Sequence, residues 1–426
     1  MSSGGINEMR MLIESGVEWL GKIPNNWKLT RIGNIYEERN EKVSDKEYQA
    51  LSVTMNGIVP QLEYVVKSEI RDNRKKICIN DFVINSRSDR RGAYGVSDYD
   101  GSCSLINIVL KPRNLEDIRY YNYVLQTKRF PDEFYRWGTG IVSDLWSTHW
   151  ENMKKIVLPM PSSDERRKIV NYLDIKCREI DLLINKEQKL IEKFQEYREA
   201  LITEKTLQGL DNTVDFRESG YQWLGKIPAH WKTVYSKKLF TLRRERALEG
   251  DEQLTSSQKY GIILQSKFMK LEGRQVVQVV KGEDILKHVE KGDFVISMRS
   301  FQGGLEYSTI SGKISSAYVM LIPNKKLVCN DYYKWLFKSK RYIKALQSTS
   351  NLVRDGQALR FSNFAQVYLP HFSLTEQEKI GTYLNEKCSD IDLAIEESMK
   401  LINTLRNYKK SLIYEYVTGK RKVPEL

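Results

Sequence analysis

The sequence has no run of about eighteen apolar residues, the length that a membrane-spanning helix needs. Its start, MSSGGINEMR, lacks the apolar core of a secretion signal. Five cysteines and four histidines are scattered along 426 residues, and no two cysteines form a Cys-x-x-Cys pair. We therefore expect neither a disulfide framework nor a metal site, and the expected location is a reducing cytoplasm.

Motifs for catalysis are missing as well. There is no Gly-x-Gly-x-x-Gly loop, no Asn-Pro-Pro-Tyr or Asp-Pro-Pro-Tyr, and no Ser/His/Asp or Cys/His constellation. A nuclease-like pattern can be assembled from Pro131-Asp132 and Glu187-Gln188-Lys189. A metal-dependent nuclease needs carboxylates that converge on one ion, however, and Glu187 lies far along the chain in a predicted helix. We therefore assign no catalytic residue and no metal ligand.

What the chain does have is positive charge and length. The 68 Lys and Arg residues exceed the 55 Asp and Glu residues, which gives a net charge of +13. Such an excess favours a polyanionic partner, nucleic acid before membrane, although a solvated basic surface is the plainer alternative. With 41% hydrophobic residues, the chain can build the two or three cores that its length predicts.

A short motif occurs twice, as ESGVEWLGKIPNNW (residues 14–27) and ESGYQWLGKIPAHW (residues 218–231). We call these two segments the plugs. Their glycines and lysine have the spacing of a phosphate-binding loop, but such a loop needs Ser or Thr after the Lys, and a helix must follow. Ile and Pro follow the Lys in both copies, so we reject a nucleotide site. The large apolar residues predict a structural element that seats the start of a domain.

The repeat extends over the whole chain. DFVINSRS (residues 81–88) matches DFVISMRS (residues 293–300), and IVNYLDIKCREIDLLI from Ile169 matches IGTYLNEKCSDIDLAI from Ile380. The middle portions, residues 40–150 and 245–360, differ almost everywhere else. A duplication that keeps its ends while its middle portions differ indicates one scaffold that carries two different recognition domains.

The middles contain short β-rich runs, DFVIN and INIVL in the first half and QVVQVV and AYVMLI in the second. The helical patterns DIRYYNYVLQTK and DYYKWLFKSKRYIKALQ lie between or after them. Each middle is therefore predicted to be a mixed α/β or α+β domain of about 150 residues.

A heptad pattern follows each middle. Eight of ten seam positions are apolar in the first segment and seven of ten in the second, and polar residues stand at matching places, Glu187 with Ser398 and Arg198 with Lys409. This pattern predicts helices of roughly 34 residues, about 50 Å long, whose polar seam residues fix the register. One chain carries both helices, so we expect an antiparallel intramolecular pair with a domain at each end. The alternative is an intermolecular coiled coil in a homodimer.

The chain resembles a known family. It is similar to the specificity (S) subunit of type I restriction-modification systems in its domain-helix-domain-helix order and in two passages, LPMPSSDERRKIVNYLDIKCREID and LPHFSLTEQEKIGTYLNEKCSDID. The repeated WLGKIPxxW motif adds to the likeness, which covers essentially the whole chain. The first passage departs slightly, with Glu165-Arg166 where Glu376-Gln377 has the more usual pair.

The resemblance implies an α+β fold: two tandem mixed α/β target recognition domains joined by two long helices packed as an antiparallel coiled coil, in a pseudo-twofold duplicated chain. The expected parts are a first recognition domain (1–160), a first spacer helix (161–210), a second recognition domain (211–371) and a second spacer helix (372–426).

For function, the resemblance implies that each domain reads one half of a bipartite site in double-stranded DNA. The helices would set the unread gap and dock two modification (methyltransferase) subunits. Motor-nuclease restriction subunits complete such a complex. S-adenosylmethionine, ATP and Mg²⁺ belong to those partners, and no cofactor and no membrane contact is expected for this chain. A free-standing two-headed nucleic-acid binder without enzyme partners is the alternative.

The predicted DNA contacts lie in two loop segments of each half, where Arg and Asn or Gln can read bases and Ser or Thr can contact phosphates. The segment after DFVI offers Asn85, Arg87, Arg90, Arg91 and Tyr94 in the first half, and Arg299, Ser300 and Gln302 in the second. The segment before the return to the helix offers Arg136, Thr139, Arg354 and Gln357. For any one of these residues a solvated turn is the alternative.

Overall fold

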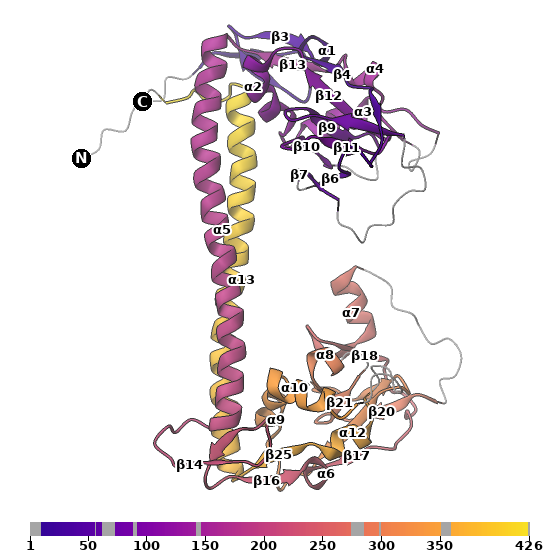
Figure 1. Ribbon diagram of the computed structural model, residues 1–426, viewed down its shortest axis with the longest axis vertical. Helices are drawn as coiled ribbons and strands as arrows, with labels where there is room; N and C mark the ends of the chain where they lie inside the picture. The colour runs from indigo at the N-terminus through magenta and orange to yellow at the C-terminus, as the bar shows by residue number, and fades with distance from the viewer. Residues whose placement is uncertain are drawn as a thin grey trace, which may run out of the picture. The chain divides into compact units, whose positions relative to one another are not determined.

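The computed structural model describes residues 10–424, apart from residue 56 and the segments 62–72, 88–91, 142–145, 274–284, 298–299 and 351–358. The chain divides into two compact units. The first comprises Met1–Glu187 and Lys400–Leu426, and the second comprises Gln188–Met399. Each unit contains one mixed α/β part and a segment of each of two long helices (Figure 1). The predicted α+β fold is therefore confirmed, whereas the domain boundaries given above stay predictions.

The two long helices are α5 (Ser163–Gln208) and α13 (Leu374–Val417), with 46 and 44 residues. Both exceed the roughly 34 residues that the heptads indicate. The extra turns form because apolar spacing continues beyond the heptads. Leu207 and Val417, at the two C-terminal ends, are 1% and 0% exposed, so these last turns pack into the units.

The helices run antiparallel within each unit. In the first unit the rings of Tyr172 and Tyr416 lie 4.7 Å apart, and further along α5 the Asp181 carboxylate accepts hydrogen bonds from the Lys409 ammonium at 2.7 Å. Residue numbers thus rise on α5 as they fall on α13. The intramolecular antiparallel pair that the sequence predicts is confirmed.

The duplication reaches individual ion pairs in this helix pair. In the second unit Arg198 pairs with Asp392 at 3.1 Å, and in the first unit Lys409 pairs with Asp181. Arg198 and Lys409 are 211 positions apart, and so are Asp181 and Asp392. The same seam contact is therefore made twice, as the predicted role of Arg198 and Lys409 in register requires.

The plugs form hairpins, β1 (Leu12–Glu14) with β2 (Lys22–Pro24) and β14 (Phe216–Glu218) with β15 (Lys226–Pro228). Lys22 opens a strand, not the helix that a phosphate-binding loop needs. Four large apolar side chains of the first plug are no more than 6% exposed: Trp19, Leu20, Ile23 and Trp27. The structural role that the sequence predicts for the plugs is therefore confirmed.

Each plug fastens two helix ends together. In the first unit the Trp27 indole N–H donates to Glu165, in the first turn of α5, at 2.8 Å. A Cβ added to Gly419, just past α13, would lie 2.5 Å from Pro24 and 2.9 Å from Trp27, so this glycine packs directly on the plug. The plug therefore holds the start of one helix against the end of the other.

The second unit repeats this arrangement. The Trp231 indole N–H donates to Glu376 of α13 at 3.0 Å. A Cβ on Gly209, just past α5, would lie 3.4 Å from the Trp231 ring. The two glycines have φ values of +77° and +70°. This left-handed conformation ends a helix and favours glycine.

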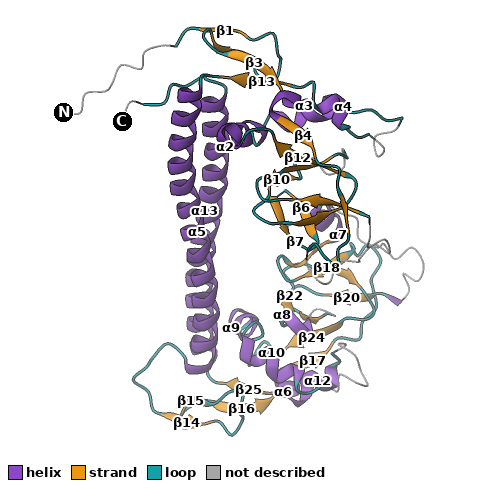
Figure 2. Cartoon of the chain, turned by 45° about the horizontal axis from the view of Figure 1, so that its top comes forward, coloured by secondary structure: helices purple, strands orange, loops and turns teal. Residues whose placement is uncertain are grey.

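The first unit carries an antiparallel four-stranded sheet of order β10-β9-β12-β4 and a three-stranded sheet of order β11-β8-β5. Figure 2 labels β4, β10 and β12 of the four-stranded sheet. Their strands are β4 (Tyr36–Glu38), β5 (Lys42–Val43), β8 (Arg74–Ile77), β9 (Phe82–Asn85), β10 (Tyr94–Val96), β11 (Gly101–Cys103) and β12 (Asn107–Pro112). A hairpin of β6 (Leu51–Thr54) and β7 (Gly57–Pro60) packs beside them. The predicted strands DFVIN and INIVL are thus the central pair, β9 and β12.

The second unit has an equivalent sheet of order β17-β24-β21-β22. Its strands are β17 (Phe240–Leu242), β21 (Phe294–Ile296), β22 (Glu306–Tyr307) and β24 (Val319–Pro323). Two strand pairs accompany it, β18 (Leu254–Ser257) with β19 (Gly261–Leu264), and β20 (Lys287–Val289) with β23 (Gly312–Ile314). The predicted strand QVVQVV lies outside the described residues.

Pairs of short helices join these sheets to the long helices, α2 (Leu115–Leu125) with α3 (Phe130–Arg136), and α9 (Asn330–Leu336) with α10 (Lys340–Gln347). The helical pattern over residues 331–347 is therefore confirmed, and it forms two helices with a break between them. It breaks because the Ser339 hydroxyl caps α10 by accepting the Tyr342 N–H. The Tyr120 hydroxyl donates to the Val417 carbonyl, and the Tyr332 hydroxyl donates to the Thr206 carbonyl, both at 2.7 Å. These bonds satisfy carbonyls that the helix ends leave unpaired.

The remaining elements complete the same frame in both units. They are β3 (Lys28–Arg31) with β13 (Val157–Met160), β16 (Lys232–Tyr235) with β25 (Tyr368–His371), and the short helices α1 (Ile32–Ile35), α4 (Trp150–Met153), α6 (Ser236–Leu239), α7 (Gln265–Glu272), α8 (Ser300–Gly303) and α12 (Phe361–Gln366). No helix among the described residues is long and apolar enough to cross a membrane.

Candidate nucleic-acid interface

The first predicted contact segment begins where β9 ends. Asn85 is only 5% exposed, and its side-chain oxygen accepts the Arg87 N–H at 3.0 Å, so it shapes the turn. Arg87 is exposed. Tyr94 is half-buried on β10 and stacks on Phe82, with ring centroids 6.0 Å apart, and burial raises the pKa of its hydroxyl. Arg90 and Arg91 lie outside the described residues.

The second predicted segment of the first unit meets the first one at Ser147. The N–H groups of Thr139 and Ser147 each donate to the other's carbonyl, at 2.9 and 3.0 Å. Ser147 also forms a backbone bridge with Arg87. Two segments that lie about fifty positions apart in the sequence are therefore joined at one short backbone segment. Thr139 is exposed beside it.

Arg136, at the end of α3, has a more defined environment than the sequence suggests. Its guanidinium pairs with Glu18 of the plug at 2.6 Å and with Glu133 at 3.1 Å. The side chain is still 54% exposed. A phosphate would have to compete with these two carboxylates, so Arg87 is the less encumbered arginine of the pair.

A cleft of about 300 Å³ lies beside Arg87. Asn107 contributes to its wall and is 4% exposed; its amide nitrogen donates to the Ser104 carbonyl at 3.2 Å. Among the described residues no partner is found for its side-chain oxygen. His149 and Trp150 complete the polar and aromatic part of this cleft. Sequence reasoning missed these three residues, and only the Asn at the start of the apolar run INIVL could have drawn attention.

In the second unit, Ser300 is 1% exposed and its hydroxyl accepts the Ser297 N–H at 2.8 Å, so it caps the turn into α8. Gln302, on the same short helix, is exposed. Arg299, Arg354 and Gln357 lie outside the described residues. Exposed Arg87, Arg136, Thr139 and Gln302, together with half-buried Tyr94, are therefore the predicted contacts that the structure places at the surface.

A buried ion pair fixes the start of each central strand behind these loops. Arg39 contacts Asp81 at 2.7 Å in the first unit, and Arg243 contacts Asp293 at 2.6 Å in the second. The hydrogen bond to the carboxylate raises the pKa of each guanidinium, and both carboxylates are at most 2% exposed. The Asp of the repeated DFVI motif therefore holds the sheet and is not available to a ligand.

The second unit also contains a buried imidazole between two carboxylates. His288 is 3% exposed, with Nδ1 2.8 Å from Asp251 and Nε2 3.2 Å from Glu290. Burial lowers the pKa of His288, but the hydrogen bonds to both carboxylates outweigh it, so the pKa is raised. Hydrogen bonds, the one from Ser311 above all, lower the pKa of Glu290 to about 2. The cluster therefore ties β20 to two loops, and its two carboxylates favour the protonated form of the His288 imidazole.

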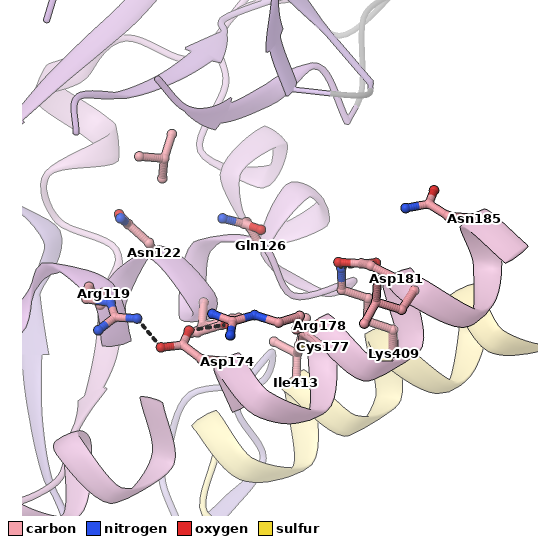
Figure 3. Close-up of a pocket in the computed structure, with 13 residues that line it drawn as sticks. Arg119, Asn122, Gln126, Asp174, Cys177, Arg178, Asp181, Asn185, Lys409 and Ile413 are labelled. Atoms are coloured by element: carbon pink, nitrogen blue, oxygen red, sulfur yellow. Dashed lines mark hydrogen bonds and ion pairs between the residues drawn. The ribbon is translucent and has the colours of Figure 1, made fainter. Parts of the chain in front are cut away.

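A cleft of about 620 Å³ lies between α2, α5 and α13 of the first unit (Figure 3). Asp174 receives an ion pair from Arg119 and a hydrogen bond from the Tyr123 hydroxyl at 2.8 Å. At the matching place in the second unit, the Trp335 indole N–H donates to Asn385 at 2.8 Å, and Arg198 lies over the ring at 5.4 Å. The two units thus share the arrangement of helices at this place, while the side chains between the helices differ.

The described residues contain no group of three or more His, Cys, Asp or Glu side chains that could hold a metal ion. The cations and amides at the loop ends can bind phosphates and base edges.

No protein-family profile matches the sequence. Among solved structures, a chain from a study of complex assembly and conformational transition of the type I R-M system matches with a TM-score of 0.65 and 13% identity, over 95% of this chain and 100% of that one. The HsdS subunit from Thermoanaerobacter tengcongensis matches with a TM-score of 0.48 and 14% identity, over 93% of this chain and 98% of that one. The S subunit of a type I restriction-modification system from M. genitalium matches with a TM-score of 0.37 and 14% identity, over 94% of this chain and 97% of that one. The chain therefore shares its fold with a chain of a type I R-M system.

Proposed function

We propose that the chain is the DNA-recognition subunit of a type I restriction-modification complex. Each unit reads one half of a bipartite site in double-stranded DNA, and the helix pair sets the unread gap and docks two modification subunits. The chain itself catalyses nothing in this proposal. S-adenosylmethionine serves the modification subunits, and ATP and Mg²⁺ serve the restriction subunits.

The observation that carries the proposal is a duplicated frame with unlike loop ends. The plug contacts, the helix-end hydrogen bonds and the buried Arg–Asp pair occur in both units with equivalent residues. At the ends of the central strands, however, Asn85 and Asn107 in the first unit correspond to Ser297 and Tyr318 in the second. Two domains that the same contacts hold in place, but whose loop ends carry different side chains, suit two different DNA half-sites.

The charge of the chain supports a DNA partner. A net charge of +13 favours phosphate contacts. Arg87 stands exposed at the point where the two loop segments of the first unit meet. An arginine at such a place can donate two parallel hydrogen bonds to a guanine.

The deciding experiment is co-expression of the full chain with the adjacent modification gene, followed by mapping of methylated adenines in the host genome. A bipartite motif that appears only when the chain is present is the expected result. Arg87→Ala should then relax one position of one half-site, by about 1–3 kcal/mol for a lost bidentate contact. An equal loss on all sequences would make Arg87 a phosphate contact instead.

The second candidate is a two-headed nucleic-acid binder that works without enzyme partners, which the same charge and the same two heads would allow. Co-purification separates the two. A chain that binds DNA but stays alone when expressed with its neighbouring genes would favour the free-standing binder and refute the subunit proposal.

A further inference from the structure

A third cleft of the first unit is lined mainly by polar side chains. It measures about 550 Å³ and lies between the segment that leads into α3 and the last turns of α13. Lys128, Arg129 and Lys410 line it together with one carboxylate, Asp132. The neutral side chains in its wall are Asn407, Ser411 and Tyr414. Three cations against one carboxylate leave the cleft with an excess of positive charge.

Two of the three cations of this cleft have no carboxylate partner within the described part of the chain. Lys128 and Lys410 are exposed, and neither forms an ion pair within the described part of the chain. The Arg129 guanidinium lies over the Tyr414 ring, 5.0 Å from its centroid. Stacking of this kind holds a guanidinium in place and leaves its edge free to donate hydrogen bonds.

The second unit provides a natural comparison at the same place in the frame. Lys128-Arg129 corresponds to Lys340-Arg341, 212 positions later, and Lys410 of α13 corresponds to Glu199 of α5, 211 positions earlier. In the second unit Lys340 and Glu199 form an ion pair. The counter-charge for this lysine therefore comes from a helix of the protein itself.

In the first unit the same position on the helix carries a lysine, so a lysine faces a lysine across the cleft. Asn407 likewise stands where the second unit has Glu196. Two carboxylates of α5 are thus replaced on α13 by an amide and an amine. Like charges brought together in this way are unfavourable unless an anion lies between them.

We propose that this cleft of the first unit is a docking site for a carboxylate side chain that a helix of a partner protein presents. The proposal rests on the proposed function, in which the partner is the modification subunit. A protein carboxylate is favoured over a DNA phosphate because the matching position of the second unit is already filled by a carboxylate on a helix, Glu199. The two units consequently offer the modification subunits two unequal surfaces, one with an open anion site and one closed by its own ion pair.

The test compares two charge changes at matching positions in the full chain. Lys410→Glu restores in the first unit the charge pattern that Lys340 and Glu199 have in the second. It should therefore leave thermal stability unchanged or raised, while affinity for the purified modification subunit falls at least about tenfold at one of two sites. Glu199→Gln removes the ion pair of the second unit and should change that affinity by less than about twofold.

Titration of the modification subunit into each variant, followed by calorimetry at two salt concentrations, gives the readout. Loss of affinity in Lys410→Glu together with a weaker salt dependence supports the proposal. Unchanged affinity overturns it, and so does a loss confined to DNA binding, which would assign the cleft to a phosphate. If the wild-type chain binds no modification subunit at all, the proposed function fails and this inference fails with it.

Discussion

Three glycines allow the packing of the helix ends to be measured. Gly419, Gly209 and Gly250 all have a left-handed backbone, with φ of +70°, +77° and +85°. A Cβ at Gly250 would meet no atom within 4 Å, whereas one at Gly209 would lie 3.4 Å from the Trp231 ring. At Gly419 the added carbon would lie 2.5 Å from two ring atoms of Pro24. Replacing each of these glycines by alanine therefore separates the cost of the left-handed backbone, which all three share, from the cost of steric overlap, which differs among them.

The expected free energies of unfolding follow from these distances. Every Gly→Ala change pays about 1–2 kcal/mol for the left-handed conformation, offset by about 0.4–1 kcal/mol from the less flexible unfolded chain. Gly250→Ala and Gly209→Ala should therefore destabilise by about 1 kcal/mol each. Gly419→Ala adds overpacking of a rigid proline ring, about 1–3 kcal/mol, for a total of about 2–4 kcal/mol.

Urea unfolding of the three variants and the wild type is the assay, and the free energy of unfolding from each curve is the quantity compared. The reasoning would be refuted if Gly419→Ala cost no more than Gly250→Ala. In that case Gly419 would not be seated on the plug, and the plug would not connect the two helices of the first unit.

Three further predictions concern spacing, modularity and pH. Four residues inserted into each long helix, after Glu187 and after Met399, should lengthen the unread gap between the half-sites by about two base pairs, because four helical residues add about 6 Å. Maps of methylated sites measure the gap, and an unchanged gap would exclude the helices as spacers. Exchange of residues 40–150 for those of another specificity subunit should change one half-site, and a change in both would contradict independent heads. Because the folded pKa of His288 is raised, its stabilisation is complete below about pH 6.5, the unfolded value, and is lost as pH rises through the folded pKa. Unfolding midpoints of His288→Gln should therefore fall below the wild type at pH 6 and approach it at high pH, and a constant difference would rule out this titration.

The helices and central strands that the two units share could be predicted from the sequence because their motifs occur twice. The repeats from Ile169 and Ile380 gave the helix pair, and the repeated DFVI motif gave a central strand in each unit. What the repeats did not reveal was the partner of each motif. That the Trp of the plug donates to Glu165 depends on a contact across 138 positions, and no local pattern encodes such a contact.

The candidate interface was less accessible to sequence reasoning. Arg87 could be proposed because it follows a strand and carries the right donors, but its meeting with Ser147 depends on how two loops cross. Asn107 was hidden inside an apolar run, where a buried amide has no periodic signal. The break between α9 and α10 was not predicted, because the cap at Ser339 interrupts a helical pattern that is continuous in the sequence.

The first unit is discontinuous in the chain, and this has a consequence for biosynthesis. Residues 188–399 of the second unit emerge from the ribosome as one uninterrupted segment, whereas the first unit lacks residues 400–426 until synthesis is nearly finished. Until then the Tyr120 hydroxyl has no Val417 carbonyl to bind, and Pro24 and Trp27 have no Gly419 packed on them. The half of the protein that is translated first is therefore the half that matures last, and its exposed apolar surface has to be tolerated, or shielded by a chaperone, in the interval.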